Sequence, residues 1–470
     1  MDVPVCLVQE IMRACAFVAA MSAEGPDVSG FASRVRSGSW VEKWPDEKGE
    51  LVASTVQGEI WTEAIQAAID QHRAVYLPKR DKPYYIDAPI VLRSGCRLVA
   101  DPEAEIRLRP GSNRCMVRNE HIVDGHSGPV EPDANADEDL QIVGGIWTTL
   151  ATTDQESNGN ANGWALPGGP FCAHGTILLS NVRRVVVRDV TIRQCRPHGI
   201  QISNASHFLV ENIRFDRHHR DGVHINGPAS FGHVRNVRVV RGVMGDDLIA
   251  LNAWDWYHTV VSFGPIHHVL VEDVVGQAPS EPKAPSEIRL LGGTKRYADG
   301  RTVDCDIHDC VLRNIEGIRT FKAYDQPNLE RGRDKDFADP IGNIKNVQIE
   351  NVRFAADHGA APFQIAHNVD GLTIRDVRLG FEPKDGFALV EIGPLSMTFK
   401  ANPADPATWV EVFSPDKDCT VRNFELTQVQ TPTKPADPKH LIRLIQQKIN
   451  PDYPNTTPRG GVGRGILLSE

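Results

Sequence analysis

Apolar and polar residues alternate in short stretches along most of the chain after about residue 175, without any segment of helical length. Such alternation is typical of strands, whose side chains point in turn to opposite faces. A three-residue marker recurs with these stretches: Arg or Glu, then Asn or Asp, then an apolar residue. It appears as RDV at 188, ENI at 211, RNV at 235, EDV at 272, RNI at 313, ENV at 350, RDV at 375 and RNF at 422.

The spacings between these markers are 23, 24, 37, 41, 37, 25 and 47 residues, so a basic unit of about two dozen residues alternates with units that carry insertions. A unit of this size buries its inward residues only against its neighbours, which is the principle of a solenoid. We therefore predict an all-β fold, a parallel β-helix with its insertions gathered as loops on one side. The repeated Asn or Asp predicts a ladder of side chains at a turn. A β-sandwich is the alternative, but it does not explain the repeated marker.

The first part of the chain predicts a cap for this solenoid. Ile65, Ala68 and Ile69 share one face of a short helical segment, and the stretches AVYLP, YYID, IVL, CRLVA and EIRLR that follow it predict short strands. We expect a polar leader, partly disordered, over residues 1–55, the β-helix over 56–430, and a C-terminal helix and tail over 431–470.

Composition narrows the class of protein. With 41% hydrophobic and 24% charged residues, the chain of 470 residues has the profile of a folded, soluble protein, and no stretch is apolar for long enough to cross a membrane. The net charge of −10 argues against a nucleic-acid partner. Nine scattered cysteines form neither a disulfide framework nor a zinc motif. Asp2, Glu10 and Arg13 argue against a signal peptide at the N-terminus, which slightly favours a cytoplasmic protein over a periplasmic or secreted one, but the compartment stays open.

Three successive units align as HGIQIS from His198, DGVHIN from Asp221 and DLIALN from Asp247. This register places the apolar residues of each stretch inward and stacks His198, Asp221 and Asp247 at the start of one column of strands, with Asp246 just before it. Since neighbouring strands lie about 4.8 Å apart, three carboxylates are expected to share one small region.

Three clustered carboxylates suit glycosidic bond cleavage. One carboxyl, kept protonated by its anionic neighbours, donates a proton to the leaving oxygen, and another, ionised, activates water. The alternatives are a solvated turn of aspartates and a Ca²⁺ site. We expect catalysis by Asp221, Asp246 and Asp247, with neither a metal nor a cofactor.

The RDG motif followed about one coil later by GDD and LIAL resembles the Asn-Thr-Asp and Gly/Gln-Asp-Asp motifs of the polygalacturonases, glycoside hydrolase family 28. That family belongs to the pectin-lyase-like superfamily, and the resemblance covers roughly residues 60–430. It implies a right-handed single-stranded parallel β-helix with an N-terminal capping helix. It also implies an inverting hydrolase in which Asp246 is the general acid and Asp221 and Asp247 position the attacking water.

Two departures from the family pattern concern this site. His219 and Arg220 stand where the family has Asn-Thr, and SEIRLLGG, with Arg289, stands where the family has Gly-His-Gly. His224, just beyond Asp221 on the strand and pointing outward, is expected to compensate by bonding a carboxylate.

Further candidates for substrate binding surround the three acids. GIRTFKAYD is a loose counterpart of the family's Arg-Ile-Lys, but Arg319 and Lys322 face the same groove only if a bulge lies between them. Together with Arg289 they form a cationic patch that suits a uronate. The other candidates are the histidines and the aromatic residues of flanking loops: His198, His224, Trp254, Trp256 and Trp164.

The sequence thus favours a glycoside hydrolase acting on a polysaccharide or oligosaccharide, with uronate as the preferred sugar. A lyase or epimerase on the same fold, with Arg289 or Arg319 as base, is a second hypothesis. A non-catalytic carbohydrate-binding or assembly protein, such as a spike-like trimer, is a third. The oligomeric state stays open.

Overall fold

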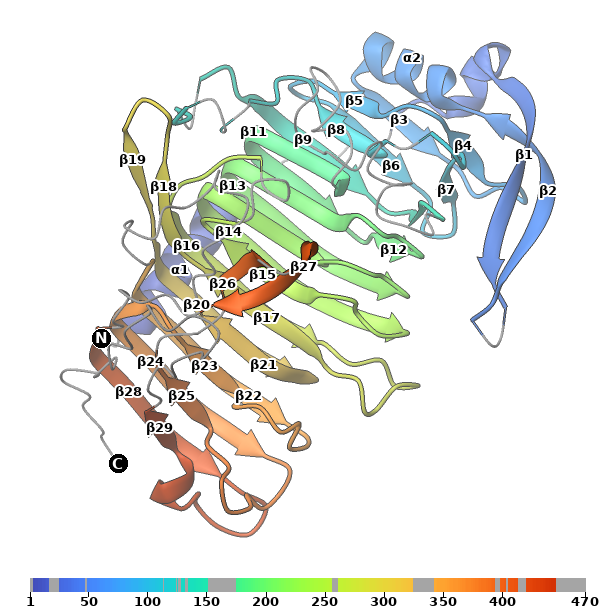
Figure 1. Ribbon diagram of the computed structural model, residues 1–470. Coiled ribbons are helices and arrows are strands. Elements are labelled where there is room, and N and C mark those ends of the chain that lie inside the picture. Colours follow the sequence, from blue (N-terminus) through green and yellow to red (C-terminus); the bar gives the residue numbers. More distant parts are fainter. Residues whose placement is uncertain are drawn as a thin grey trace.

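The computed structural model describes residues 3–16, 25–46, 49–112, 114–123, 125, 128–131, 134–150, 175–255, 261–323, 342–393, 398–402, 405–412 and 420–444. Most of this chain is extended, and the strands of one coil pair in parallel with those of the next (Figure 1). The predicted parallel β-helix is therefore confirmed.

Short strands build the first coils: β3 Ala74–Leu77, β4 Tyr84–Ile86, β5 Ile90–Leu92, β6 Arg97–Ala100, β7 Glu105–Leu108, β8 Val117–Asn119, β9 Asp137–Val143, β10 Ile146–Thr148 and β12 Thr191–Arg193. Three long strands in the middle bend around corners of the solenoid: β11 Gly175–Arg188, β13 His198–Asp216 and β14 Val223–Arg241. The later coils contain β15 Asp247–Asn252, β16 Ile266–Val275, β17 Ser286–Leu291, β20 Ile307–Glu316, β21 Ile318–Ala323, β22 Asn343–Phe354, β23 Phe363–Ile365, β24 Asn368–Leu379, β25 Val390–Ile392, β28 Val421–Gln430 and β29 Ile442–Leu444.

These strands form stacked columns along the solenoid. One column, which we call the site column, runs from β5 through β8, β11, β13, β14, β15, β17, β21, β23 and β25 to β29. A second runs from β3 through β6, β9, β11, β13, β14, β16, β20, β22 and β24 to β28. A third starts with β4, β7, β10 and β12 and continues into the last parts of β13 and β14.

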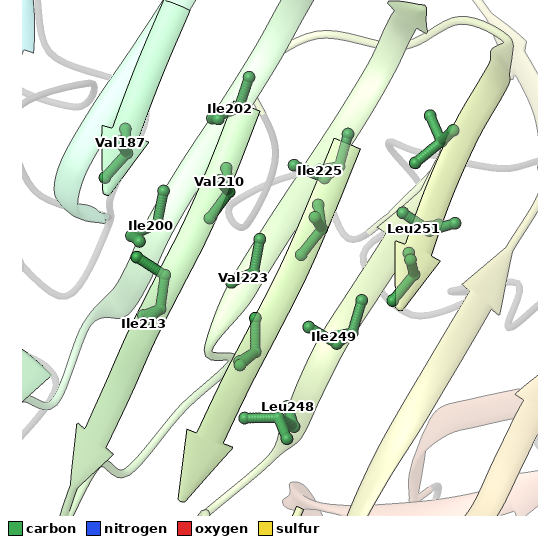
Figure 2. Packing of buried hydrophobic residues seen from close by; sticks show 14 of the residues in the cluster. Val187, Ile200, Ile202, Val210, Ile213, Val223, Ile225, Leu248, Ile249 and Leu251 are labelled. Carbon is green, nitrogen blue, oxygen red and sulfur yellow. The ribbon is translucent and has the colours of Figure 1, made fainter. Parts of the chain in front are cut away.

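The core fills the space between the columns with the apolar residues that the alternation places inward. Ile200 pairs in register with Val223, and Val223 with Ile249; all three are fully buried in one continuous cluster (Figure 2). The inward register predicted for these units is confirmed.

The repeated marker has a structural cause in its middle residue, which turns a corner of each coil. The eight residues at this position all have φ between 48° and 59°: Asp189, Asn212, Asn236, Asp273, Asn314, Asn351, Asp376 and Asn423. Asn and Asp tolerate this left-handed conformation better than other side chains. Several also bond the next coil, as Asn212 Nδ2 does with Asp189 Oδ1 at 2.8 Å and Asn351 Nδ2 with Asn314 Oδ1 at 2.8 Å. The predicted ladder is present.

Helix α2 (Thr62–His72) caps one end of the solenoid, next to β3 and β5 (Figure 1). Its buried face contains the predicted Ile65, Ala68 and Ile69. Two antiparallel hairpins project from the coils; they are formed by β18 Gly293–Arg296 with β19 Thr302–Cys305 and by β26 Thr398–Asn402 with β27 Asp405–Val412.

The leader is more ordered than predicted. Residues in the range 1–55 form helix α1 (Val3–Ala14), the 3₁₀ turn η2 (Val28–Arg34) and the hairpin of β1 (Arg36–Pro45) with β2 (Leu51–Ile60). Leu7, Val8 and Ile11 of α1 are buried against Leu270 and Val311 on the outer surface of the second column, which explains the apolar pattern of this segment. Among the described helices none is long and apolar enough to span a membrane.

The solenoid also extends past residue 430. Within residues 431–444, where the expected C-terminal helix would begin, the chain forms the 3₁₀ turn η5 (Pro438–His440) and β29, which pairs with β25. Residues 445–470 lie outside the described chain, and a helix there stays a prediction.

Candidate active site

The three predicted acids meet on the site column. Carboxylate oxygens of Asp221, Asp246 and Asp247 lie within 4.8 Å of one another. Asp221 and Asp247 are 5% and 1% exposed, whereas the side chain of Asp246 is 42% exposed. Asp246 is thus the most open of the three acids.

Two glycines permit this close approach of consecutive coils. A Cβ on Gly222 would lie 2.6 Å from the carbonyl oxygen of Leu248, and a Cβ on Gly245 would lie 1.9 Å from that of His219. Since real Cβ atoms cannot approach a backbone oxygen so closely, each position requires glycine. The glycines of RDG and GDD therefore allow the two acidic turns to stack.

A bulge in β15 separates Asp247 from the strand that follows it. Asp247 pairs with Glu287 and Ile249 with Ile288, so Leu248 is the extra residue of β15. Leu248 and Ile249 both lie in the core (Figure 2). Because a bulge breaks the strict alternation of a strand, two neighbouring apolar residues can point inward here.

Asp221 is held by a buried histidine. His224 Nδ1 donates to Asp221 Oδ2 at 2.5 Å, and the Asn226 amide and the Asp255 carboxylate lie 2.9 and 3.4 Å from Nε2. The ring of His198 stacks on that of His224 with 4.3 Å between centroids. The predicted contact of His224 with a carboxylate is confirmed.

These contacts determine the charges of His224 and Asp221. Burial alone would lower the pKa of His224, but the carboxylates of Asp221 and Asp255 raise it to about 9. Burial opposes ionisation of Asp221, but the charge and hydrogen bond of His224 outweigh it and bring the pKa of this carboxyl below its ordinary value. Asp221 is therefore a carboxylate at any pH near neutrality.

The pKa values of the other two acids, Asp246 and Asp247, are raised instead of lowered. Burial, followed by the negative charge of Asp221, raises the pKa of Asp246 to about 6. Burial also raises the pKa of Asp247 to about 7, although Arg289 Nε donates to its Oδ2 at 2.5 Å. Neighbouring carboxyl groups whose pKa values are driven apart in this way are typical of acid and base pairs. The site therefore keeps a proton and a fixed carboxylate side by side.

A second charged group lies one strand further along the column. Arg319 Nε donates to Glu287 Oε1 at 2.7 Å, and Lys322 Nζ donates to Oε2 of the same residue. Ser286 pairs with Ile318 and Glu287 with Thr320, so Arg319 is the extra residue of a bulge. The bulge predicted as the condition for Arg319 and Lys322 to face one side is present.

The predicted cationic patch is thus real, but its members are bonded to acids of the protein. Arg289 binds Asp247, and its Nη2 lies 4.0 Å from Oδ1 of Asp246. Arg319 and Lys322 bind Glu287. A substrate carboxylate would have to compete with these pairs.

Three of the residues predicted to bind substrate lie in other surroundings. Trp254 is fully buried in the main core, and it cannot stack on a sugar; the prediction for it was wrong. His198 and His224 are 2% and 0% exposed; His198 stacks on His224, and His224 bonds Asp221, so neither faces solvent. Trp256 and Trp164 lie outside the described residues.

The three carboxylates also have the ligand chemistry of a Ca²⁺ site, and His198, Asp221 and His224 form a second cluster of possible ligands. His224 and Arg289 already neutralise Asp221 and Asp247, respectively. The acid cluster therefore does not require a cation to balance its charge.

Several residues of the site were not predicted from sequence: Glu287, Asp255, Asn226 and His218. His218 Nε2 donates to the carbonyl oxygen of Asp221 at 2.8 Å, and burial lowers its pKa to about 4, so it is neutral. Nothing in the segment HHRDG shows whether His218 or His219 turns inward. Asn226 shares the alternation of His224 along β14, and that is the signal that could have found it. Asp255 lies after the end of β15, where no strand alternation points to it.

No protein-family model matches the chain, and no curated protein matches it. Several solved structures are similar to it at low identity. The surface protein and adhesin PfbA of Streptococcus pneumoniae is 12% identical, with 89% of this chain and 99% of that chain covered and a TM-score of 0.39. Endo-xylogalacturonan hydrolase from Aspergillus tubingensis is 10% identical, with 87% and 95% covered and a TM-score of 0.40. The tailspike protein of E. coli bacteriophage HK620, solved with a pentasaccharide, is 12% identical, with 85% and 76% covered and a TM-score of 0.46.

These neighbours include both glycoside hydrolases and an adhesin, so a similarity at this level concerns the fold alone.

Proposed function

We propose that the protein is a glycoside hydrolase acting on a polysaccharide or an oligosaccharide. One observation carries the proposal: a fixed carboxylate, Asp221, lies beside an open carboxyl, Asp246, whose pKa is raised to about 6. Glycosidic cleavage needs a proton donor for the leaving oxygen and an ionised carboxylate for the attacking water.

The roles follow from exposure and charge. Asp246 is the general acid, because it is protonated below its raised pKa and only its side chain is open among the three. Asp221 and Asp247 are buried and bonded to His224 and Arg289, so neither can move onto an anomeric carbon. Asp221, which stays ionised, is placed to accept the proton of a water molecule that Asp247 helps to hold, and a direct attack by this water gives inversion of configuration.

The spacing of the acids does not itself favour inversion. Carboxyl groups of inverting enzymes are usually about 6.5 to 9.5 Å apart, and those of retaining enzymes about 5 to 5.5 Å. The nearest oxygens here lie within 4.8 Å. Inversion therefore rests on the burial of Asp221 and Asp247 and on the resemblance to family 28.

The same resemblance suggests a polygalacturonase-like enzyme with a uronate substrate. A uronate carboxylate would reach Arg319 and Lys322 only by displacing Glu287 from both, whereas a neutral sugar needs no such exchange. Arg289 or Arg319 as the base of a lyase is less favourable, because guanidinium groups remain protonated and these two are bonded to acids.

A panel of polysaccharides, assayed for reducing ends and for ultraviolet absorbance, tests the proposal. A hydrolase raises reducing ends without new absorbance. A lyase creates an unsaturated, absorbing product, and a binding protein does neither. Cleavage that produces the absorbing product, or that stops when divalent cations are chelated, would contradict the proposed chemistry.

A further inference from the structure

Glu287 is a fourth acid in the column of the three predicted ones. It stands opposite Asp247 on one side and Thr320 on the other, and it is 7% exposed. A carboxylate is strongly disfavoured at such a position unless cations and hydrogen bonds replace its water. We therefore expect cations and hydrogen-bond donors around the carboxylate of Glu287.

Both oxygens of Glu287 are engaged by cations. Arg319 Nε bonds one oxygen and Lys322 Nζ the other. The bulge at Arg319 is what allows both residues to reach the same carboxylate, because strict alternation would turn one of them away. The bulge in β21 thus lies at the place where two cations bind Glu287.

Glu287, Arg319 and Lys322 lie in the strands next to the catalytic acids. Lys322 pairs in register with Arg289, which binds Asp247. The positive charge of Lys322 also lowers the pKa of Asp246 and of Asp247, as expected for a cation close to both. A sugar that offers its leaving oxygen to Asp246 therefore lies beside this group.

We infer that Glu287 is an internal counterion that takes the place of a substrate carboxylate, so that the sugar bound beside Asp246 is uncharged. The inference rests on the proposed function and names its substrate class. Arg289, Arg319 and Lys322 each bind a carboxylate of the protein. A uronate carboxylate could bind Arg319 and Lys322 only by displacing Glu287 from them, which would leave that buried acid without its hydrogen bonds.

A neutral sugar suits the same groups. Arg319 has a side chain that is 52% exposed, so its guanidinium can donate to hydroxyl oxygens while Nε stays on Glu287. Glu287 fixes that guanidinium in place. Removing the negative charge of Glu287 should therefore change which sugar is bound, from neutral to anionic.

The test is the binding of simple sugars to the full chain, measured as ligand-dependent thermal stabilisation. D-galacturonate and D-glucuronate are compared with D-galactose and D-glucose at equal ionic strength, with the wild type and Glu287→Gln. The wild type should show no preference for the uronates. Glu287→Gln should bind a uronate at least about tenfold more tightly than the neutral sugar, the scale of a charge-assisted hydrogen bond.

Glu211→Gln is the matched control, because it removes the acid of another Arg–Glu pair, with Arg235, on the second column. It should gain no uronate preference. A wild type that prefers uronates overturns the inference, and so does a folded Glu287→Gln protein without the gain. If Glu287→Gln does not fold, the wild-type comparison decides alone.

This outcome is separate from that of the proposed function. Hydrolysis of a uronide by the wild type would keep the glycoside hydrolase and overturn the role of Glu287. The predicted binding pattern without hydrolysis of any polysaccharide would keep the neutral-sugar site and count against the hydrolase.

Discussion

His224 Nδ1 lies 2.5 Å from Asp221 Oδ2, and the side chains of both residues are almost completely buried. Asp255 lies on the other side of the same imidazole, 3.4 Å from Nε2. The two carboxylates raise the pKa of His224 to about 9, and a protonated His224 keeps Asp221 ionised. This contact lowers the pKa of Asp221, whereas the pKa values of Asp246 and Asp247 are raised.

Replacing His224 should therefore destabilise the protein. His224→Gln leaves the buried Asp221 without its cation, and breaking a buried ion pair in this way costs about 3 to 5 kcal/mol. Urea unfolding at pH 7 measures the loss. A change in the free energy of unfolding below about 1 kcal/mol would mean that Asp221 is not held as an ion.

The same variant should alter the pH dependence of stability. The pKa of His224 is raised above its unfolded value, so its contribution is complete below about pH 6.5 and is lost as the pH rises through about 9. The free energy of unfolding of the wild type should fall between about pH 6.5 and 9. In His224→Gln this fall should be smaller.

Activity should decrease as the pH rises through about 6, because the general acid Asp246 must be protonated. The charge of Arg220 lowers the pKa of Asp246, so Arg220→Gln should move the alkaline limb of kcat/KM to higher pH. Arg238→Gln, an exposed position that bonds Asn236 on the marker corner, should leave the limb in place. A shift to lower pH in Arg220→Gln would contradict the assignment of the acid.

Replacing Trp254 should lower the stability of the protein without weakening sugar binding. It is fully buried in the main core, so Trp254→Ala should lower the free energy of unfolding by about 3 to 5 kcal/mol, as large cavities do. Trp254→Phe, which keeps an aromatic ring, should cost less and should leave KM nearly unchanged. A large increase in KM with normal stability would show that Trp254 contacts substrate.

The configuration of the first product tests the roles of Asp221 and Asp247. If both hold a water molecule, proton NMR in the first minutes of reaction should show the inverted anomer, before mutarotation. A product with the substrate's configuration would make one of these aspartates a nucleophile, as the short spacing of the acids would then indicate.

The sequence could predict the features that depend on period. Alternation alone gives the inward register of Ile200, Val223 and Ile249, and that register stacks Asp221 on Asp247. The recurring Asn or Asp predicts the corner ladder because few other residues adopt its left-handed conformation. In these cases local geometry decides the structure.

Features set by contacts between distant segments could not be predicted in this way. Nothing near Trp254 shows that its insertion returns it to the core, so its position among aromatic residues suggested a binding loop. Glu287 was overlooked beside Arg289, because its two cations lie in a later coil and reach it only through the bulge at Arg319. Helix α1 is ordered by a surface more than 200 residues away, around Leu270 and Val311.

The most direct test of the central claim is the turnover of Asp246→Asn on a polysaccharide that the wild type cleaves, measured by the release of reducing ends. Asn keeps the shape of the side chain but cannot donate a proton as an acid does, so turnover should fall by about 10² to 10⁴ with the thermal midpoint nearly unchanged. The control is Asp299→Asn, in the β18–β19 hairpin, whose carboxylate pairs with Arg301 and which should keep full activity. Turnover in Asp246→Asn close to that of the wild type would contradict the account.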